Sequence, residues 1–151
     1  MRLSRNFVLS ELTRSQTASR LGIDNTPSVE DIQRLRLLCE HVLQPVRDHF
    51  RRAVLVTSGF RCQELNSRIG GSESSRHTVG EAADFSVVGV PNLEVCRWIR
   101  DELNFDQLIA EFIDPAVDGS GWVHVSYGAD SNRKQVLTVT HNGVSLGLPT
   151  Q

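Results

Sequence analysis

The chain has 151 residues, of which 39% are hydrophobic and 23% are charged. These fractions are typical of a soluble globular protein and exclude fibrous and disordered chains, and the length predicts one domain over residues 1–151. Sixteen lysines and arginines against eighteen aspartates and glutamates leave a formal charge of −2, without the basic excess typical of nucleic-acid-binding proteins. We therefore expect no nucleic-acid partner.

The sequence also argues against secretion and membrane insertion. The first residues lack the uninterrupted apolar region of a signal peptide, and no later stretch approaches the ~18 apolar residues of a membrane span. The three cysteines, Cys39, Cys62 and Cys96, are an odd number without metal-type spacing, which disfavours a disulfide framework. We expect a protein that is cytoplasmic as made and has no membrane partner, and we also expect a monomer.

The first half of the chain predicts two helices and one strand. The polar segment 13–26 is interpreted as a surface connection. Ser28 is a helix N-cap, and apolar residues then recur at three- and four-residue steps over 32–46, which predicts a helix that Pro45 should kink or restart. The other elements expected in this half are a buried strand over 53–57, a short helix over 64–69 and a loop over 70–75.

The second half predicts mostly strands. Its helix begins near Pro91 or Asn92, and Asn142–Gly143 is a strong signal for a tight hairpin. Strands that follow one another through hairpins, with helices grouped at the start and middle of the chain, indicate an α+β fold with a central, largely antiparallel sheet and flanking helices. The expected strands are 82–88, 107–113, 121–127, 135–140 and 144–148.

Polar side chains on two of these strands are unusual for a protein core. Period-two alternation places Trp122 and His124 on one face of the strand 121–127. If this strand and the one before it form a hairpin centred at 117–118, Glu111 lies directly opposite His124. This register would combine two separate polar residues into one site.

A third polar element lies earlier in the chain, where His77 stands in a loop and Asp84 enters a strand. Two histidines and one carboxylate are the ligand set of a catalytic zinc site that keeps one position for water. The pattern predicts one zinc ion held by His77, Asp84 and His124, with Glu111 as the base. The competing interpretation of the separate residues is structural, with His77 a solvated loop histidine and Asp84 a strand-end cap.

A non-haem iron oxygenase is an alternative, because two histidines and a carboxylate also form the facial triad of that class. The first histidine and the acid of such a triad are usually separated by a single residue, whereas six residues lie between His77 and Asp84. The spacing therefore favours the zinc site.

The motifs around these residues point in the same direction. Ser75–Asp84 has the pattern S-x-H-x-x-G-x-A-x-D and Trp122–Val125 has W-x-H-V, and this pair resembles the family of zinc D-Ala-D-Ala carboxypeptidases and L-alanyl-D-glutamate endopeptidases, which has a hedgehog-like fold. The resemblance includes Ser58–Arg61 and also Glu11–Ser15, a segment of the sort seen in phage-encoded members. It implies a metallopeptidase that cleaves the stem peptides of bacterial peptidoglycan with the zinc ligands named above.

The same resemblance implies roles beyond the metal. Arg61 matches an arginine that holds substrate carboxylate or carbonyl oxygens, Ser75 would lie in the substrate groove, and Trp122 could line it. Many members place the catalytic acid a few residues before the distal zinc histidine, where the only ionisable residue of this chain is Asp118. We prefer Glu111 as the base and keep Asp118 as the alternative.

The departure from the family pattern leaves a second alternative open, a non-catalytic zinc-bearing structural or wall-binding virion module. The sequence also leaves open which stem-peptide bond is cut. The resemblance favours a phage lysin or a virion component, which would reach the cell wall after release from the cell or as part of the virion. His41, His49 and His141 are interpreted as surface residues without partners and receive no role.

Overall fold

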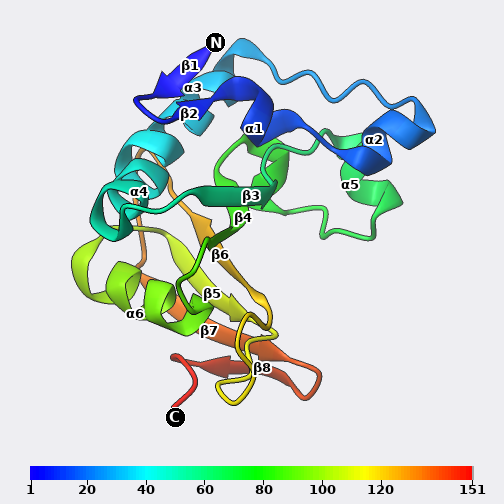
Figure 1. Cartoon of the computed structure of the whole chain (residues 1–151). Coiled ribbons are helices and arrows are strands. Elements are labelled where there is room, and N and C mark those ends of the chain that lie inside the picture. Colours follow the sequence, from blue (N-terminus) through cyan, green and yellow to red (C-terminus); the bar gives the residue numbers. More distant parts are fainter. Residues whose placement is uncertain (151) are drawn as a thin grey trace.

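The computed structural model describes residues 1–150, which form two β-sheets with helices packed around them (Figure 1). The central sheet has six strands: β3 (Val54–Ser58), β4 (Ala82–Val87), β5 (Gln107–Glu111), β6 (Trp122–Ser126), β7 (Gln135–Thr140) and β8 (Gly143–Leu146). Their order is β3-β4-β6-β5-β7-β8, and all neighbouring strands are antiparallel except β5 and β7. A smaller sheet pairs β1 (Arg2–Ser4) with β2 (Phe7–Val8). The predicted α+β class with a largely antiparallel sheet is confirmed.

The helices lie mainly in the first two thirds of the chain. Ser28 caps the first long helix, as predicted, in a capping box with Asp31. Pro45 stands in the first turn of the next α-helix, and a turn of π-helix with helical backbone angles at both ends precedes it. The helix thus restarts at the proline, one of the two predicted outcomes. The helices are α1 (Leu9–Thr13), α2 (Gln16–Leu21), α3 (Val29–Leu38), the π-helix η1 (Cys39–Leu43), α4 (Gln44–Phe50), α5 (Gln63–Arg68), the 3-10 helix η2 (Arg76–Val79) and α6 (Asn92–Glu102).

The segment 13–26 was predicted as a surface connection, and that prediction is wrong for its centre, which forms α2. Ser15 caps this helix at its start and Gly22 ends it at φ 67°. Among its residues, only Ala18 is buried. A six-residue helix with one buried side chain has no apolar periodicity, so its sequence looks like that of a loop.

The hydrophobic core lies on one face of the central sheet. Leu108 of β5 and Val123 and Val125 of β6 are fully buried there, in one cluster with apolar side chains of α3, η1, α4 and α6. Figure 1 shows α3, α4 and α6 on the same side of the sheet. Each such side chain contributes about 1.5–3 kcal/mol when fully buried. Because side chains alternate along a strand, His124 points to the opposite face.

The register of the hairpin between β5 and β6 differs from the predicted one. Glu111 pairs with Trp122, and Ile109 is the residue opposite His124, so the predicted pairing of Glu111 with His124 is wrong by two residues. The cause lies at the two ends of the loop between the strands, where Phe112 directly after β5 has φ 53° and Gly121 directly before β6 has φ 65°. The Phe112 N–H donates a hydrogen bond to the Val139 carbonyl oxygen of β7 at 2.8 Å and does not pair with β6.

A shift of two residues keeps every side chain on its predicted face, since the side-chain period of a strand is two. Glu111 therefore still shares a face with His124, one diagonal step along the sheet. The loop after β5 closes tightly because Gly121 has no Cβ, which would lie 2.1 Å from the Glu111 carbonyl oxygen. The glycine thus helps to fix where β6 begins.

The three histidines outside the metal motifs do have partners, so the prediction that they lack them is wrong. His41 stacks on Tyr127 with ring centroids 4.6 Å apart, His49 stacks on Trp98 at 4.3 Å, and His141 lies 4.9 Å from Phe112. All three remain exposed. Within residues 1–150, no helix combines the length and apolar character required to cross a membrane.

Candidate metal centre and active site

Three side chains from separate elements converge on the face of the sheet opposite the core. His77 comes from η2, Asp84 from β4 and His124 from β6, and Asp84 and His124 are direct cross-strand partners. Their potential ligand atoms all lie within 4.8 Å of one another. Nδ1 of His124 is 2.8 Å from one Asp84 oxygen, and Nε2 of His77 is 3.3 Å from the other. The structure thus brings the three predicted metal ligands together.

Short-range contacts hold His77 in this position. The Ser75 hydroxyl accepts a hydrogen bond from the His77 N–H at 3.3 Å and so caps η2. Gly80 ends η2 at φ 79°, and a Cβ there would lie 2.6 Å from the Asp31 carbonyl oxygen of α3. The serine and glycine of the sequence motif therefore have structural roles that aim the histidine ring.

The protonation of His77 suits a metal ligand. Its Nδ1 lies 2.7 Å from the Gly59 carbonyl oxygen, which can only accept, so Nδ1 carries the proton and Nε2 is left with a lone pair. That lone pair faces a carboxylate oxygen of Asp84 at 3.3 Å, and two such groups repel unless a cation lies between them. Zinc bonds of about 2.0–2.2 Å with tetrahedral geometry place neighbouring ligand atoms about 3.3 Å apart. The residues present therefore fit a zinc ion.

The electrostatics of Asp84 also suit a metal ligand. Burial alone would raise the pKa of its carboxyl group, but the hydrogen bond from His124 and the nearby His77 ring hold it well below its usual range. Asp84 is therefore ionised at neutral pH. It supplies the negative charge that a divalent cation needs between two neutral imidazoles.

Glu111 lies on the same face as the three ligands and is half-buried. Burial and the nearby charge of Asp84 raise the pKa of its carboxyl group, while His124 and Arg61 partly oppose the shift. A raised pKa makes a carboxylate a stronger base near neutral pH. Glu111 thus has the position and the proton affinity expected of a general base beside the metal centre.

Arg61 follows β3, and the charges of Asp84 and Glu111 both act on its guanidinium. Its backbone N–H donates to the His77 carbonyl oxygen at 3.0 Å. Its Nε is buried and has no hydrogen-bond partner among residues 1–150, and burial lowers the pKa of the group. A buried donor without a partner is unfavourable unless a ligand supplies an acceptor.

The other residues predicted for the site lie in different surroundings. Trp122 is half-buried, pairs with Glu111 across the hairpin and lies 5.5 Å from the Phe112 ring. Asp118 is exposed in the loop 112–121 and lines a cavity of about 260 Å³ between that loop and α6. None of the residues that line this cavity is a metal ligand. The structure therefore brings Glu111, and not Asp118, to the face of the sheet that carries the three candidate metal ligands.

Two asparagines position the site and were missed by the sequence analysis. Asn25, in the segment interpreted as a surface connection, donates to the Phe60 carbonyl oxygen at 3.0 Å and accepts from the Cys62 N–H at 2.7 Å, so it holds the segment that carries Arg61. Asn92 donates to the carbonyl oxygens of Ser120 and Gly121, which ties α6 to the start of β6. No local sequence pattern signals such long-range amide contacts.

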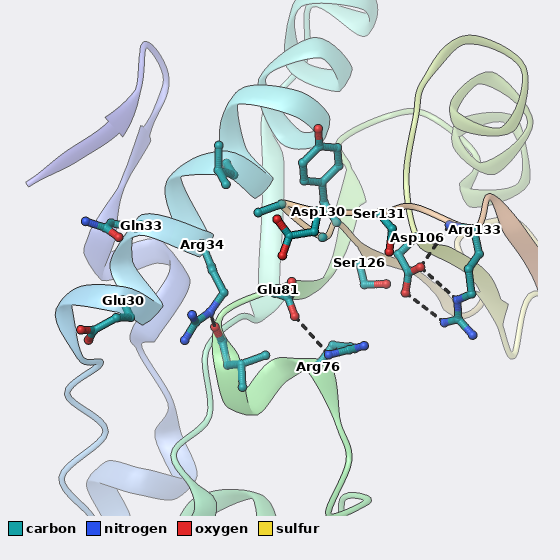
Figure 2. A pocket seen from close by; sticks show the side chains of 15 residues that line it. Glu30, Gln33, Arg34, Arg76, Glu81, Asp106, Ser126, Asp130, Ser131 and Arg133 are labelled. Atoms are coloured by element: carbon teal, nitrogen blue, oxygen red, sulfur yellow. Dashed lines mark hydrogen bonds and ion pairs between the residues drawn. The ribbon is translucent and has the colours of Figure 1, made fainter.

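A cavity of about 780 Å³ lies between α3, η2 and the segment 126–133 (Figure 2). Figure 2 shows Arg76 facing Glu81, with an ion-pair distance of 3.3 Å, and Arg133 forming a fork on Asp106 with a contact of 2.9 Å. None of the three metal ligands lines this cavity. Four of its charged side chains are paired with one another.

The profile of the Peptidase M15 family matches residues 5–126. The match covers well over half of the chain, so the protein belongs to this family of zinc-dependent metallopeptidases. The mixed α+β architecture with its mostly antiparallel sheet is consistent with the M15 peptidase fold. No curated protein sequence matches the chain.

Proposed function

We propose that the chain hydrolyses a peptide bond in the stem peptides of bacterial peptidoglycan, with one zinc ion held by His77, Asp84 and His124. The observation that carries the proposal is the convergence of these three ligands within 4.8 Å on a sheet face. Membership of the M15 family supports a peptidoglycan-related substrate.

Bound zinc supplies Lewis acidity, which polarises a carbonyl group and lowers the pKa of a water from 15.7 to about 7. Glu111 accepts the proton of the attacking water and then donates it to the leaving amine. The raised pKa of its carboxyl group supports this double role. Asp118 is the alternative base and has weaker support, since it is exposed in a loop that faces α6.

Arg61 orients the substrate in this proposal. Its guanidinium has an unused buried donor, and a substrate carboxylate or carbonyl oxygen would supply the missing acceptor. Trp122 borders the groove beside Glu111. Ser75 contributes by capping η2, and through its place next to the metal motif it would also border the groove.

The bond that is cut is either D-Ala-D-Ala at the end of the stem peptide or L-Ala-D-Glu near the glycan, so the enzyme is a carboxypeptidase or an endopeptidase. We further propose that the chain acts as a monomer of one domain, as a phage lysin or a virion-associated enzyme. The resemblance of Glu11–Ser15 to phage-encoded members supports this setting.

Digestion of purified peptidoglycan tests the proposal. The wild-type protein, the protein with a chelator and the protein with chelator plus excess zinc are compared, and the released ends are identified by mass spectrometry. We expect new peptide ends in the first and third reactions only, and the identity of these ends assigns the bond. Absence of any chelator-sensitive product from several wall types would contradict the proposal and favour the non-catalytic virion module.

A further inference from the structure

The cavity of about 780 Å³ between α3, η2 and the segment 126–133, which we call the charged cavity, adjoins the candidate metal site at two points. Ser126 lines it and stands two residues after His124 on β6, so both side chains point to the same face of the sheet. Arg76 also lines it and directly precedes His77 in η2. The cavity therefore begins beside two of the candidate metal ligands.

Two of the arginines that line the charged cavity are engaged by the protein itself. Arg133 forms a fork on Asp106 with two contacts of 2.9 Å. Arg34 donates to Asp31 at 2.7 Å and to the Val79 carbonyl oxygen at 2.5 Å. Figure 2 shows these two arginines at opposite ends of the cavity. Their hydrogen bonds hold the walls of the cavity and leave them few donors for a ligand.

Arg76 and Asp130 lie between these two ends and are much less engaged (Figure 2). The side chain of Arg76 is 57% exposed, and its ion pair with Glu81 is a single contact at 3.3 Å, so most of the five N–H donors of its guanidinium are available. Asp130 is exposed and forms no ion pair with any other residue of 1–150. The cavity thus offers one guanidinium and one carboxylate to a ligand.

The stem peptide contains a residue whose charges match this pair. Its third residue is a diamino acid, in most bacteria lysine or diaminopimelate, and diaminopimelate is lysine with a carboxylate added to the carbon that bears the side-chain ammonium group. The end of the diaminopimelate side chain is therefore a zwitterion, whereas the end of the lysine side chain is a cation. A zwitterion between Arg76 and Asp130 would have both of its charges paired.

The distance from the metal site to the charged cavity also fits this residue. The stem order is L-Ala, D-Glu, diamino acid, D-Ala, D-Ala, so the diamino acid is the second residue from the scissile bond for either candidate bond. Two residues of extended peptide span about 7 Å, and the two residues of β6 from His124 to Ser126 span about the same length. A peptide that follows β6 from the metal therefore brings its diamino acid to the cavity.

We propose that the charged cavity is a substrate subsite for the side chain of the diamino acid, in which Arg76 binds the carboxylate of diaminopimelate and Asp130 binds its ammonium group. This inference rests on the proposed peptidase function. It makes the enzyme selective for stem peptides that contain diaminopimelate over those that contain lysine. Because Arg76 and Asp130 are exposed, solvent screens both contacts and the selectivity is moderate.

Two N-acetylmuramyl pentapeptides that differ only in their third residue, diaminopimelate or lysine, test the subsite. We expect the wild type to have a KM about five- to tenfold lower for the diaminopimelate substrate, with similar kcat for both. Arg76→Gln should raise KM for the diaminopimelate substrate to the value for lysine, without raising KM for the lysine substrate. Asp130→Asn should raise KM for both, because both substrates carry the ammonium group.

Arg100→Gln is the matched control. Arg100 is also exposed and paired with an acid, but it lies on α6 and does not line the charged cavity. We expect this variant to have the wild-type KM for both substrates. Zinc content and unfolding temperature should be the same in all three variants and the wild type, since each change is at an exposed side chain.

The other outcomes separate the subsite from the activity itself. Equal KM values of the wild type for the two substrates, or an equal rise for both in Arg76→Gln, would overturn the subsite while the peptidase function stands. The subsite is also overturned if Arg100→Gln reproduces the effect of Arg76→Gln, because net charge alone would then explain it. If the wild type cleaves neither pentapeptide and no peptidoglycan, the proposed function itself fails.

Discussion

At the scale of single residues, the chemistry of the site depends on two carboxylates held in different states. The hydrogen bond from His124 and the nearby His77 ring keep Asp84 ionised, whereas burial and the charge of Asp84 raise the pKa of Glu111. One acid is thereby suited to hold a cation and the other to exchange a proton. The distinction comes from surroundings, since the two residue types have similar ordinary pKa values.

Glu111→Gln tests the proposed base. The amide keeps the size of the side chain but cannot take a proton, so we expect kcat to fall about 10²- to 10⁴-fold while zinc content and the unfolding temperature are preserved. Glu102→Gln, at an exposed position of α6, serves as the control and should have wild-type activity. Full activity of Glu111→Gln would show that another group is the base, and Asp118→Asn would then be the next variant to measure.

At the same scale, the sequence predicted which residues converge at the candidate metal site but not how they are held. The motif spacing sufficed for His77, Asp84 and His124, because a short 3-10 helix and two neighbouring strands bring them together. The roles of the Asn25 and Asn92 amides could not be predicted, because each contacts segments between 12 and 37 residues away, through hydrogen bonds with main-chain groups. A main-chain group can be offered by any residue type, so the sequence of the partner segment gives no sign of such a hydrogen bond.

At the scale of elements, the β5–β6 hairpin sets the distance between Glu111 and the metal ligands. Its register could not be read from the loop length, because Phe112 and Gly121 adopt left-handed backbone conformations that shorten the ladder. The strands themselves were predicted to within two residues at each end, because their apolar alternation is strong. The periodicity thus predicted which side chains share a face of the sheet, whereas the backbone conformation of the connecting loop determined which residues of β5 and β6 are paired.

A pair of glycine variants tests this explanation of the register. Gly119→Ala and Gly121→Ala both place alanine at positive φ, 77° and 65° respectively, which costs about 1–2 kcal/mol. Only at Gly121 would the new Cβ meet main-chain atoms, at 2.1 Å from the Glu111 carbonyl oxygen. We expect urea unfolding to show a clearly larger loss of stability for Gly121→Ala, together with reduced kcat. Equal losses would contradict the proposed role of the close contact.

The fork between Asp106 and Arg133 connects the start of β5 to the segment before β7. Asp106 accepts from the backbone N–H, Nε and Nη2 of Arg133. The side-chain hydrogen bonds of Arg133, aided by its backbone N–H, hold the pKa of Asp106 below its usual value. The stabilisation is therefore fully present above the pKa of the unfolded state, about 3.9, and is lost as the pH falls through the lower folded-state pKa.

Asp106→Asn tests this linkage. Since Arg133 is largely exposed, we expect a loss of only about 1 kcal/mol in the free energy of unfolding at pH 7, and this difference from the wild type should shrink below about pH 4. The exposed pair of Arg100 and Asp101 provides the control, since Asp101→Asn should leave stability unchanged. A difference between Asp106→Asn and the wild type that is constant from pH 7 to pH 2 would contradict the assignment.

At the scale of the whole molecule, the two faces of the central sheet have different roles. The helices α3, α4 and α6 bury one face and supply the core, while the opposite face carries the three candidate metal ligands and Glu111. The class of fold followed from the order of predicted elements. The order of the strands in the sheet did not, because it depends on the parallel pairing of β5 with β7, two strands that are separated in the chain by β6.

Zinc binding should also stabilise the folded chain. His77, Asp84 and His124 come from a 3-10 helix and two strands that are distant in sequence, so the unfolded chain cannot present them together. Zinc bound only to the folded state would raise the free energy of unfolding by about 4.1 kcal/mol at a free concentration of 1,000 Kd. The increase in the free energy of unfolding on addition of zinc would therefore measure binding at the same site that is proposed for catalysis.

The central claim, that these three residues form a zinc site, is tested most directly by the metal content of the purified protein. We expect mass spectrometry of the wild type, dialysed in the presence of zinc, to give about one zinc per chain, and the His124→Ala and Asp84→Ala variants to give almost none. A wild-type protein that takes up no zinc, that holds iron in its place, or whose zinc content is unchanged by these substitutions would contradict the claim.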